Sequence, residues 1–504
     1  MRGGIAVLVA VLVATLAGCS GSGREAAEPG VLSVGLREPG SLLPAQAHTV
    51  AQRTIVGALW TPLVTVDQDR VEPVAAESVT SQDQVNWTVR LRPGMRFHDG
   101  TPVTAKSYVD TWQAVATERW PGSRVLTDVL RPVRMRAADE TTVEIVLDRP
   151  FGQVPFVLAS PALLPLPESV LSTRDWSGFA RHPVGTGPYK MTEAWRPGNG
   201  ARLTRFDAYS GRRPGKVRDI ALRVIDDPMA QYDQVRSGDL DLATQVPKAR
   251  HESMRKDFPD RHVLWPLSEV SYLGIAVADT RLAEAAVRHA LALAVGREEL
   301  ERGPLGYQVD LAQGLAPPAV PLTQRSGPCR PCTHDPEAAK ALLEQSGGLT
   351  GPVPLRFDAD SAQGQWAPAL AEQLRRVPGV PEIVPTSLPG PEFRALLANR
   401  PSDGLFTITR TLWSPSPYEA LSGLAGPTGY ADEGFDQMLA ASEATTDPAE
   451  IGRLSRLAEN QLLRDLPVIP LWSAHGHAVW SDRVFNVTAE ALGGIDLAFV
   501  DLRD

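Results

Sequence analysis

Two cysteines separated by two residues are the pair in this chain best spaced for chemistry. Cys329 and Cys332 enclose an Arg-Pro dipeptide. A C-x-x-C pair can close a local disulfide, cycle between thiol and disulfide at a strand-to-helix junction, or give two thiolates to zinc. Zinc needs further ligands, and His334 is the only near one in the sequence. A structural disulfide is favoured in an oxidising compartment. Free thiols, redox chemistry and metal binding stay open.

Other reactive side chains give weaker signals. His475 and His477 are two residues apart on an expected strand, so they face the same side and could chelate a metal. We expect them instead to be surface or hinge residues, and His98 to be a turn residue. The sequence contains no G-x-S-x-G, no H-E-x-x-H, and no S-x-x-K with a plausible partner motif. We therefore expect no catalytic residues, no metal and no cofactor.

The first eighteen residues have the pattern of a secretory signal. Arg2 precedes an apolar run over residues 5–16, which is too short for a membrane-spanning helix of about 20 residues. The Leu-Ala-Gly-Cys sequence that ends at Cys19 resembles the lipobox of bacterial lipoproteins. That resemblance implies cleavage before Cys19 and a lipid on its sulfur and amine. We therefore expect an extracytoplasmic protein, anchored by lipid to the outer face of the cell membrane.

Length and composition limit the classes of function. The chain has 504 residues, which is enough for two or three lobes, and 43% of them are hydrophobic. The formal net charge is -9, and it becomes more negative when Arg2 leaves with the signal. An acidic chain lacks the basic face that phosphate backbones require, so we expect no nucleic acid partner.

Strand and helix patterns alternate along the whole chain. Residues 85–92 alternate as a half-buried strand does, and Thr104 can cap a helix that begins at Ala105. The longest helical spacing runs over residues 282–300, and another covers 448–463. The pattern predicts a mixed α/β or α+β fold.

Seven segments resemble the extracytoplasmic solute-binding proteins of the peptide and nickel class that serve ABC importers, and they follow one another along the chain in the order of that family. The most specific is VRLRPGMRFHDGTPVTA at residues 89–105, in which Asp99-Gly100 supplies a tight turn. The others are EPVAAES (72–78), PVGTGPY (183–189), SGDLD (237–241), VRHAL with REEL (287–300), HDPEAAKALL (334–343) and AE with LPVIPL (458–471). In PVGTGPY, Gly185 and Gly187 allow a sharp reversal and Pro188 stiffens it. A phosphate-cradling role is disfavoured, because the downstream Gly or Lys is missing.

The resemblance implies a two-lobed periplasmic-binding-protein-like α/β fold, of type II and class C, with an extra subdomain on the first lobe. Lobe I would hold residues 31–50, 180–265 and 476–504, the subdomain 51–179 and lobe II 266–475. Residues 1–18 would be the signal and 19–30 a tether. The chain would cross between the lobes near 265–273 and 470–478, which would form the hinge.

The resemblance also points to ligand-contacting residues. In the family's peptide binders, an Asp in a W-x-x-D-Y-x-D-P stretch holds the peptide's ammonium group. The matching region here, residues 410–418, places either Ser416 or Trp413 at that position. Neither is a carboxylate, so either Glu419, Asp403 or another acid replaces the Asp, or the ligand has no free α-amine. Ligand contacts are expected from four residues of this region: Arg410, Trp413, Ser416 and Tyr418.

We thus expect a non-enzymatic, monomeric solute-binding lipoprotein that delivers peptides or a peptide-like solute to an ABC permease in the membrane. Alternatives are a binder of a nickel chelate, haem, an oligosaccharide or an opine-like conjugate, and a ligand-sensing receptor. A lipoprotein hydrolase is a remote alternative.

Overall fold

The computed structural model describes residues 28, 30–325 and 327–503. The predicted signal and the predicted lipid site at Cys19 lie outside these residues. Among the helices of the described part, none has both the length and the apolarity needed to cross a membrane.

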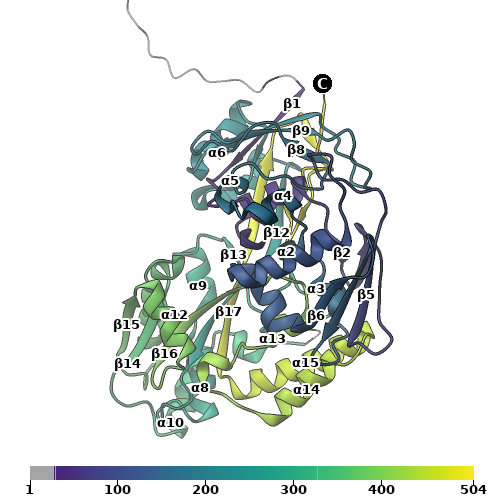
Figure 1. Ribbon diagram of the computed structural model, residues 1–504. Coiled ribbons are helices and arrows are strands. Elements are labelled where there is room, and N and C mark those ends of the chain that lie inside the picture. The colour runs from purple at the N-terminus through teal and green to yellow at the C-terminus, as the bar shows by residue number, and fades with distance from the viewer. Residues whose placement is uncertain (1–27, 29, 326, 504) are drawn as a thin grey trace, which may run out of the picture.

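Within the described residues, eleven strands form one mixed sheet that runs through the whole molecule (Figure 1). Its order is β15 (Ile383–Leu388), β14 (Val353–Asp358), β16 (Leu405–Thr411), β12 (His262–Ile275), β17 (Val468–Trp480), β11 (Leu242–Ala243), β1 (Val31–Leu36), β10 (Asp219–Val224), β9 (Ala201–Arg205) and β8 (Tyr189–Met191), while β13 (Val309–Leu311) pairs with β17. We call the half with β1 and β8–β11 lobe I, and the half with β14–β16 lobe II. This mixed α/β architecture confirms the predicted class.

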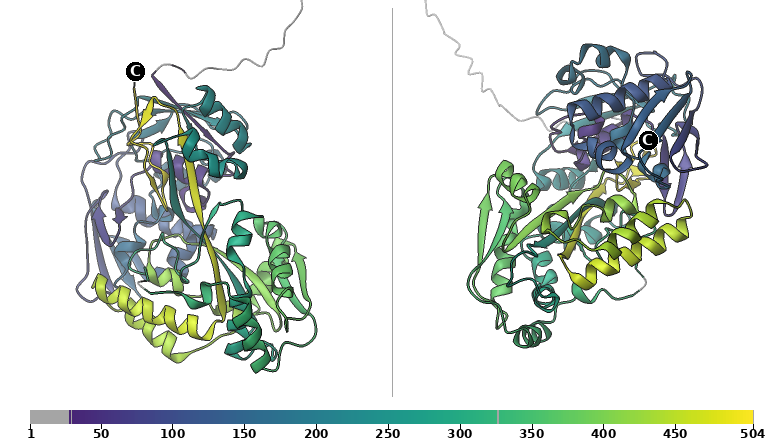
Figure 2. Two further views of the ribbon diagram at one scale, coloured as in Figure 1. Left: turned by 180° about the vertical axis from the view of Figure 1, so that it is seen from behind. Right: turned by 60° about the horizontal axis from the view of Figure 1, so that its bottom comes forward.

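The long strands β12 and β17 join the two lobes, as Figure 2 shows from behind. They pair antiparallel, but the register shifts between Pro266 and Val270. The residues between these two positions do not pair with β17, so the sheet is interrupted where a hinge is predicted. The predicted residue boundaries of the lobes stay a prediction.

A separate four-stranded sheet lies at the right of Figure 1. Its order is β4 (Ala76–Thr80), β5 (Asn86–Leu91), β7 (Thr142–Leu147) and β6 (Pro132–Ala137), and β2 (Val64–Asp67) pairs with β3 (Arg70–Pro73). Helix α2 (Ala105–Glu118) packs against β6 and β7 of this sheet, and its Tyr108 and Trp112 are buried. Thr104 caps α2, which confirms the start of this helix.

The remaining helices cover the two lobes. They are α1 (Val50–Leu59), α3 (Val154–Val157), α4 (Glu168–Thr173), α5 (Trp176–Phe179), α6 (Pro228–Ser237), α7 (His251–Asp257), α8 (Ala285–Ala294), α9 (Arg297–Arg302), α10 (Pro336–Gln345), α11 (Ala367–Arg375), α12 (Gly390–Ala398), α13 (Pro417–Leu421), α14 (Glu433–Glu443) and α15 (Pro448–Asp465). The single helix expected over residues 282–300 is wrong. Val295 has an extended backbone and Gly296 precedes a new helix, so the chain turns between α8 and α9.

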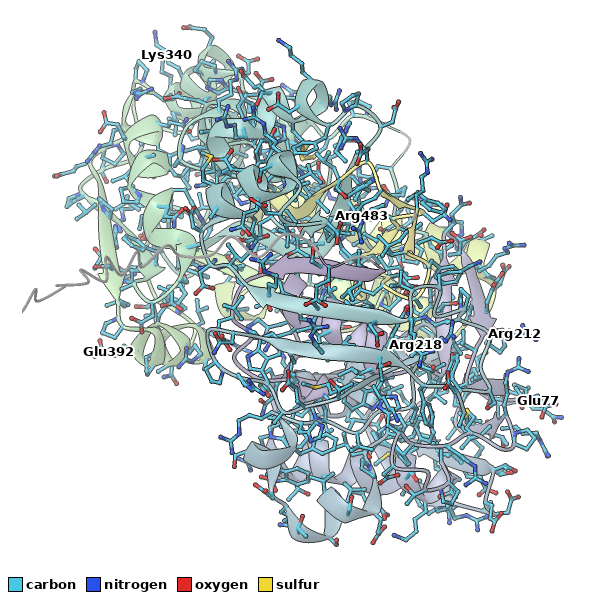
Figure 3. The ribbon with its side chains drawn as sticks, turned by 90° about the horizontal axis from the view of Figure 1, so that it is seen from above. Glu77, Arg212, Arg218, Lys340, Glu392 and Arg483 are labelled. Atoms are coloured by element: carbon cyan, nitrogen blue, oxygen red, sulfur yellow. A yellow bond between two sulfur atoms is a disulfide. The ribbon has the colours of Figure 1, made fainter. Side chains whose placement is uncertain are left out.

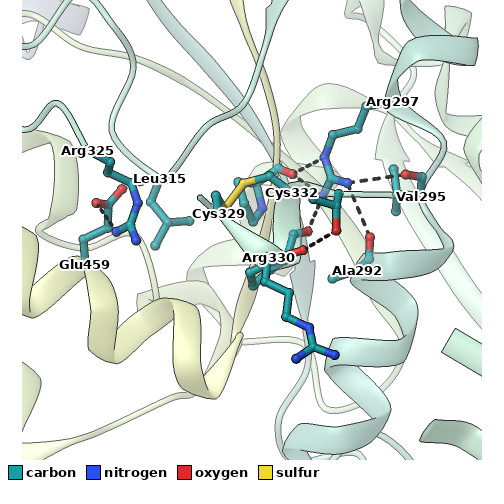
Figure 4. Close-up of a disulfide and its surroundings, with 12 residues drawn as sticks. Ala292, Val295, Arg297, Leu315, Arg325, Cys329, Arg330, Cys332 and Glu459 are labelled. Atoms are coloured by element: carbon teal, nitrogen blue, oxygen red, sulfur yellow. Dashed lines mark hydrogen bonds and ion pairs between the residues drawn. A yellow bond between two sulfur atoms is a disulfide. The ribbon is translucent and has the colours of Figure 1, made fainter. Parts of the chain in front are cut away.

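That turn places Arg297 beside the C-x-x-C pair (Figure 4). Cys329 and Cys332 are joined by a disulfide with an S–S distance of 2.07 Å. Arg297 is 3% exposed and donates to the Pro470 carbonyl of β17 and, at 2.9 Å, to the Pro331 carbonyl between the cysteines. Arg297 therefore fastens the disulfide turn to the central strand.

The C-terminal segment returns to lobe I. Arg483, labelled in Figure 3, forms an ion pair of 3.1 Å with the buried Asp241 and donates to the Val31 carbonyl of β1. Exposed charges such as Arg218 and Glu392 are spread over both lobes in the same view. The C-terminal segment thus packs on lobe I, next to its first strand β1.

His98 connects two of the sequence motifs. Its Nδ1 accepts a hydrogen bond of 3.1 Å from the Gly185 amide, and its Nε2 lies 3.1 Å from the Gly187 carbonyl. The neutral ring with its proton on Nε2 satisfies both contacts. Burial lowers the pKa of His98 to about 4. His98 therefore joins its own loop to the loop that holds Gly185 and Gly187, rather than being a simple turn residue. We call this pair of contacts the His98 clasp.

The His98 clasp predicts a pH dependence. The folded-state pKa is below the unfolded value of 6.5, so the clasp stabilises fully above pH 6.5 and loses its effect as the pH falls toward 4. This loss amounts to about 3 kcal/mol. We expect the stability difference between wild type and His98→Gln to shrink by that amount from pH 7.5 to pH 4 in urea denaturation. An equal difference at both pH values would contradict the clasp.

Candidate ligand-binding site

The loop after β1 forms the centre of the candidate site. Residues 37–49, here called the N-terminal loop, follow the carboxyl end of β1, which pairs parallel with β10 and β11. Ligands of open α/β sheets bind outside such strand ends. On one side of the loop lies a cavity of about 750 Å³. The loop therefore occupies the position where this architecture places ligands.

The cavity combines aromatic faces with charge. Trp176 of α5 and Trp195 line it together with Glu38 and Arg181. Glu38 accepts hydrogen bonds from the Trp195 indole at 2.6 Å and from the Gly198 amide at 2.7 Å. Apolar faces with a few polar groups are typical of small-molecule sites.

Helix α1 positions a buried arginine on the other side of the loop. Thr49 and Gln52 form a capping box at its start, and Gln52 also donates to the Ser41 carbonyl of the N-terminal loop at 2.9 Å. Arg53, which is 3% exposed, follows directly in the helix. The cap therefore fixes Arg53 relative to the loop.

Arg53 connects α1 to lobe II. Its guanidinium donates to Ser268 Oγ at 2.6 Å, to the Ala491 carbonyl at 2.7 Å and to the Leu412 carbonyl at 3.4 Å. Burial lowers the pKa of Arg53 to about 10, against the attraction of Glu269 and Glu419. Among the described residues none of its hydrogen-bond partners is a carboxylate, and its charge is balanced through space by Glu269 and Glu419.

Glu269 lies in the interrupted part of β12. Its side chain is exposed to solvent, yet the surrounding protein raises its pKa by desolvation, against the positive charges of Arg53 and His48. A carboxylate that contacts solvent and is also partly desolvated by protein lies in a recess rather than on an open surface. The sequence analysis missed Glu269, His48 and Arg53, because no local motif marks them.

Glu419 and Asp403, the acids proposed from the sequence, already have partners. Glu419 is buried and accepts from the Trp413 amide at 2.9 Å and the Ser414 amide at 2.8 Å. Burial raises its pKa. Asp403 pairs with Arg356 at 2.9 Å. Neither carboxylate is therefore free to receive an ammonium group in this arrangement.

Arg410 and Trp413 lie on the same segment as Glu419. Arg410 donates to the Glu419 and Ala420 carbonyls at 3.0 and 3.2 Å, in the last turn of α13. Trp413 is 3% exposed and packs against Gly122, where an added Cβ would lie 3.1 Å from its ring. Arg410 thus supports α13, and Trp413 fills the junction with the segment after α2. Their roles as ligand contacts stay a prediction.

Ser416 and Tyr418 are also enclosed by protein. Ser416 is fully buried, caps α13 and donates to Gln153 Oε1 at 2.8 Å. Tyr418 packs edge-on against Phe151 with ring centres 5.5 Å apart, and Arg149 lies over its ring. The segment 410–418 that holds the four predicted contacts also holds the Leu412 carbonyl that Arg53 binds. Their contact with a ligand remains untested.

Comparison with known proteins identifies the family. Residues 70–433 match the family described as "Bacterial extracellular solute-binding proteins, family 5 Middle". The chain belongs to this family. It is a solute-binding protein of the peptide class of ABC transporters, and it is not an enzyme.

Relatives and solved structures agree over the full length. The chain is 25% identical over 484 residues to the glutathione-binding protein GsiB of Escherichia coli O1:K1 / APEC, which covers 92% of each chain. The putative peptide-binding protein AppA from Clostridium difficile superposes with a TM-score of 0.79 at 19% identity, over 94% of this chain and 100% of that one. The open form of the murein tripeptide-binding protein MppA gives 0.77 at 18% identity, over 95% and 98%. These structures establish the two-lobed fold.

Proposed function

We propose that this protein captures a peptide or peptide-like solute between its lobes, beside the N-terminal loop, and delivers it to an ABC permease. The observation that carries the proposal is the solvent-exposed carboxylate of Glu269, which follows Ser268, the residue that Arg53 binds at 2.6 Å, and lies opposite Thr411 of β16. A carboxylate suits the ammonium group of a peptide, and the positive charge of Arg53 favours the ionised form of Glu269.

Glu269 is the proposed substitute for the missing family Asp. A desolvated ammonium requires a charge partner, and the two acids considered from the sequence are already bound within the protein. Glu269 remains open to solvent and lies opposite Thr411 in the pairing of β12 with β16. It therefore adjoins the segment 410–418, where the family places its ammonium site.

The relatives support small zwitterionic solutes. One is named as a glutathione-binding protein, and a dipeptide-binding protein of the same fold was solved with Met-Leu. A protein from A. tumefaciens with the same fold was solved with agropinic acid. A non-peptide solute such as an opine-like conjugate is the second candidate, because neither Trp413 nor Ser416 supplies a carboxylate for an ammonium group.

Glu269→Gln tests the ammonium site. We expect the variant to bind glutathione or Met-Leu at least about tenfold more weakly than wild type in isothermal titration calorimetry, because the carboxylate that would pair with the ligand's ammonium group is removed. The exposed Glu77→Gln should bind as wild type does. N-acetylated Met-Leu has no ammonium group, so it should bind wild type and Glu269→Gln equally. Equal affinity of wild type and Glu269→Gln for the free dipeptide would exclude Glu269 from the site.

Closure would complete the binding cycle. The ligand shifts an equilibrium between open and closed lobes by its higher affinity for the closed form. The interruption of β12 between Pro266 and Val270 gives a hinge at which few residues need to rotate. Arg410, Trp413, Ser416 and Tyr418 would then enclose the ligand from the lobe II side.

The lipid anchor is proposed from the sequence around Cys19. We expect Cys19→Ser to release the protein from the membrane fraction of the native host into the soluble fraction, because acyl chains at this residue would be its attachment. Wild type should stay with the membranes through a wash in 1 M salt. A Cys19→Ser protein that remains acylated and membrane-bound would contradict the lipobox assignment.

A further inference from the structure

Three histidines of the described chain meet beside the hinge. His475 and His477 project from β17, and His251 begins α7 in lobe I. The Nε2 atom of His477 lies 3.1 Å from Nδ1 of His251 and 3.1 Å from Nε2 of His475. One ring nitrogen from each residue lies within 4.8 Å of the other two. The sequence analysis considered His475 and His477 but missed His251, which is 224 residues away from His475.

When His475 is neutral, as a metal ligand must be, the hydrogen bonds around it leave electron pairs without a donor. Nδ1 of His475 lies 3.1 Å from Asp310 Oδ1, so a neutral ring carries its proton there. Nε2 then presents a lone pair to the Tyr307 carbonyl oxygen at 2.9 Å and to His477 Nε2. His477 Nε2 has at most one proton and faces two ring nitrogens, so it cannot donate to both. A cation at this point would attract every one of these atoms.

We propose that His251, His475 and His477 bind a divalent transition metal ion, of which Zn²⁺ is the best match. Imidazole nitrogens about 2.0 Å from zinc in tetrahedral geometry lie about 3.3 Å apart. The two separations that involve His477 are 3.1 Å, and the third pair of nitrogens lies within 4.8 Å. Nδ1 of His475 would donate to Asp310, the carboxylate–histidine–metal arrangement that orients a ligand ring.

His477 lies at the centre of this cluster. It is 3% exposed, and its Nε2 is the atom that both other rings approach to 3.1 Å. A metal at this point would bind the neutral form of each imidazole.

The site would also join the lobes. His251 stacks on the Tyr307 ring at 5.1 Å, and Lys248 donates to the Pro304 carbonyl at 2.6 Å. The site thus takes one ligand from α7 in lobe I, two from the shared strand β17, and support from Asp310 on β13. A bound ion would hold α7 against this strand in the present arrangement.

Zinc titration of the untagged full-length protein in detergent, after treatment with EDTA, tests the site. We expect one equivalent of Zn²⁺ to bind by calorimetry, and one equivalent of Co²⁺ to give the visible absorption of a nitrogen-ligated, low-coordinate ion. His251→Gln and His477→Gln should each weaken zinc binding at least tenfold. Asp310→Asn should weaken it about tenfold. The exposed His182→Gln is the matched control and should bind as wild type does.

Circular dichroism of each variant separates loss of the site from loss of the fold. If His477→Gln fails to fold, His251→Gln decides, because His251 lies at a partly exposed helix start. Absence of stoichiometric zinc binding in wild type would overturn the proposal. So would zinc binding that is unchanged in folded His251→Gln.

Discussion

Gly185→Ala is expected to lower the free energy of unfolding by about 4 kcal/mol or more. A Cβ at Gly185 would lie 2.0 Å from the Leu59 carbonyl oxygen and 3.0 Å from the Trp60 ring. Its backbone φ is not in the left-handed region, so close packing against the end of α1, not a sharp turn, requires glycine.

A matched glycine separates this packing from the general effect of adding a methyl group. Nothing lies within 4 Å of a Cβ built at Gly426, and its φ is also ordinary. Gly426→Ala should change the urea midpoint little, while Gly185→Ala should unfold at a much lower concentration. Equal midpoints for the two variants would contradict the packing argument. The same contact sets the position of α1 and therefore of Arg53.

Arg297→Met is expected to destabilise the protein by about 3 kcal/mol or more, because it removes charged hydrogen bonds to carbonyls that have been taken out of water. Arg297 donates from Nε at 2.9 Å and from Nη2 at 2.7 Å to Pro470 O, and again from Nη2 to Pro331 O. Burial lowers its pKa to about 9, and among its recorded partners in the described chain there is no carboxylate.

Arg302→Met is the control for Arg297→Met on the same helix. Arg302 is 59% exposed and pairs with Glu298, so its loss should cost less than about 0.5 kcal/mol. Thermal unfolding of the two variants under one set of conditions compares them directly. If both melt at the wild-type temperature, Arg297 does not fasten the disulfide turn.

Sequence patterns predicted helices and strands correctly where a single local signal, such as alternation or a capping residue, determines the structure. The alternation over residues 85–92 became β5, and Thr104 caps α2 as expected. Asp99-Gly100 needed positive φ, and Gly100 has φ 87°. The helical spacing over 282–300 failed because the chain leaves the helix at the extended Val295 and at Gly296, after which Arg297 begins a second helix and binds Pro470 and Pro331.

The candidate site was harder to predict because its parts come from distant segments. Arg53 meets Ser268 across 215 residues and Leu412 across 359. No periodicity or spacing reports such a contact. The segment 410–418 was identified only through its resemblance to the family, and the structure adds the neighbouring Glu269 and Arg53. His98 and Gly185 show the same limit, since two motifs 87 residues apart form one contact.

Native mass spectrometry of the full-length protein, purified without refolding, tests the central claim most directly. Wild type and Glu269→Gln are compared as isolated and after addition of glutathione or Met-Leu. The account predicts a one-to-one complex of wild type with a peptide, either co-purified or added, that Glu269→Gln retains poorly. A wild-type protein that carries only a non-peptide mass and takes up neither peptide would contradict it.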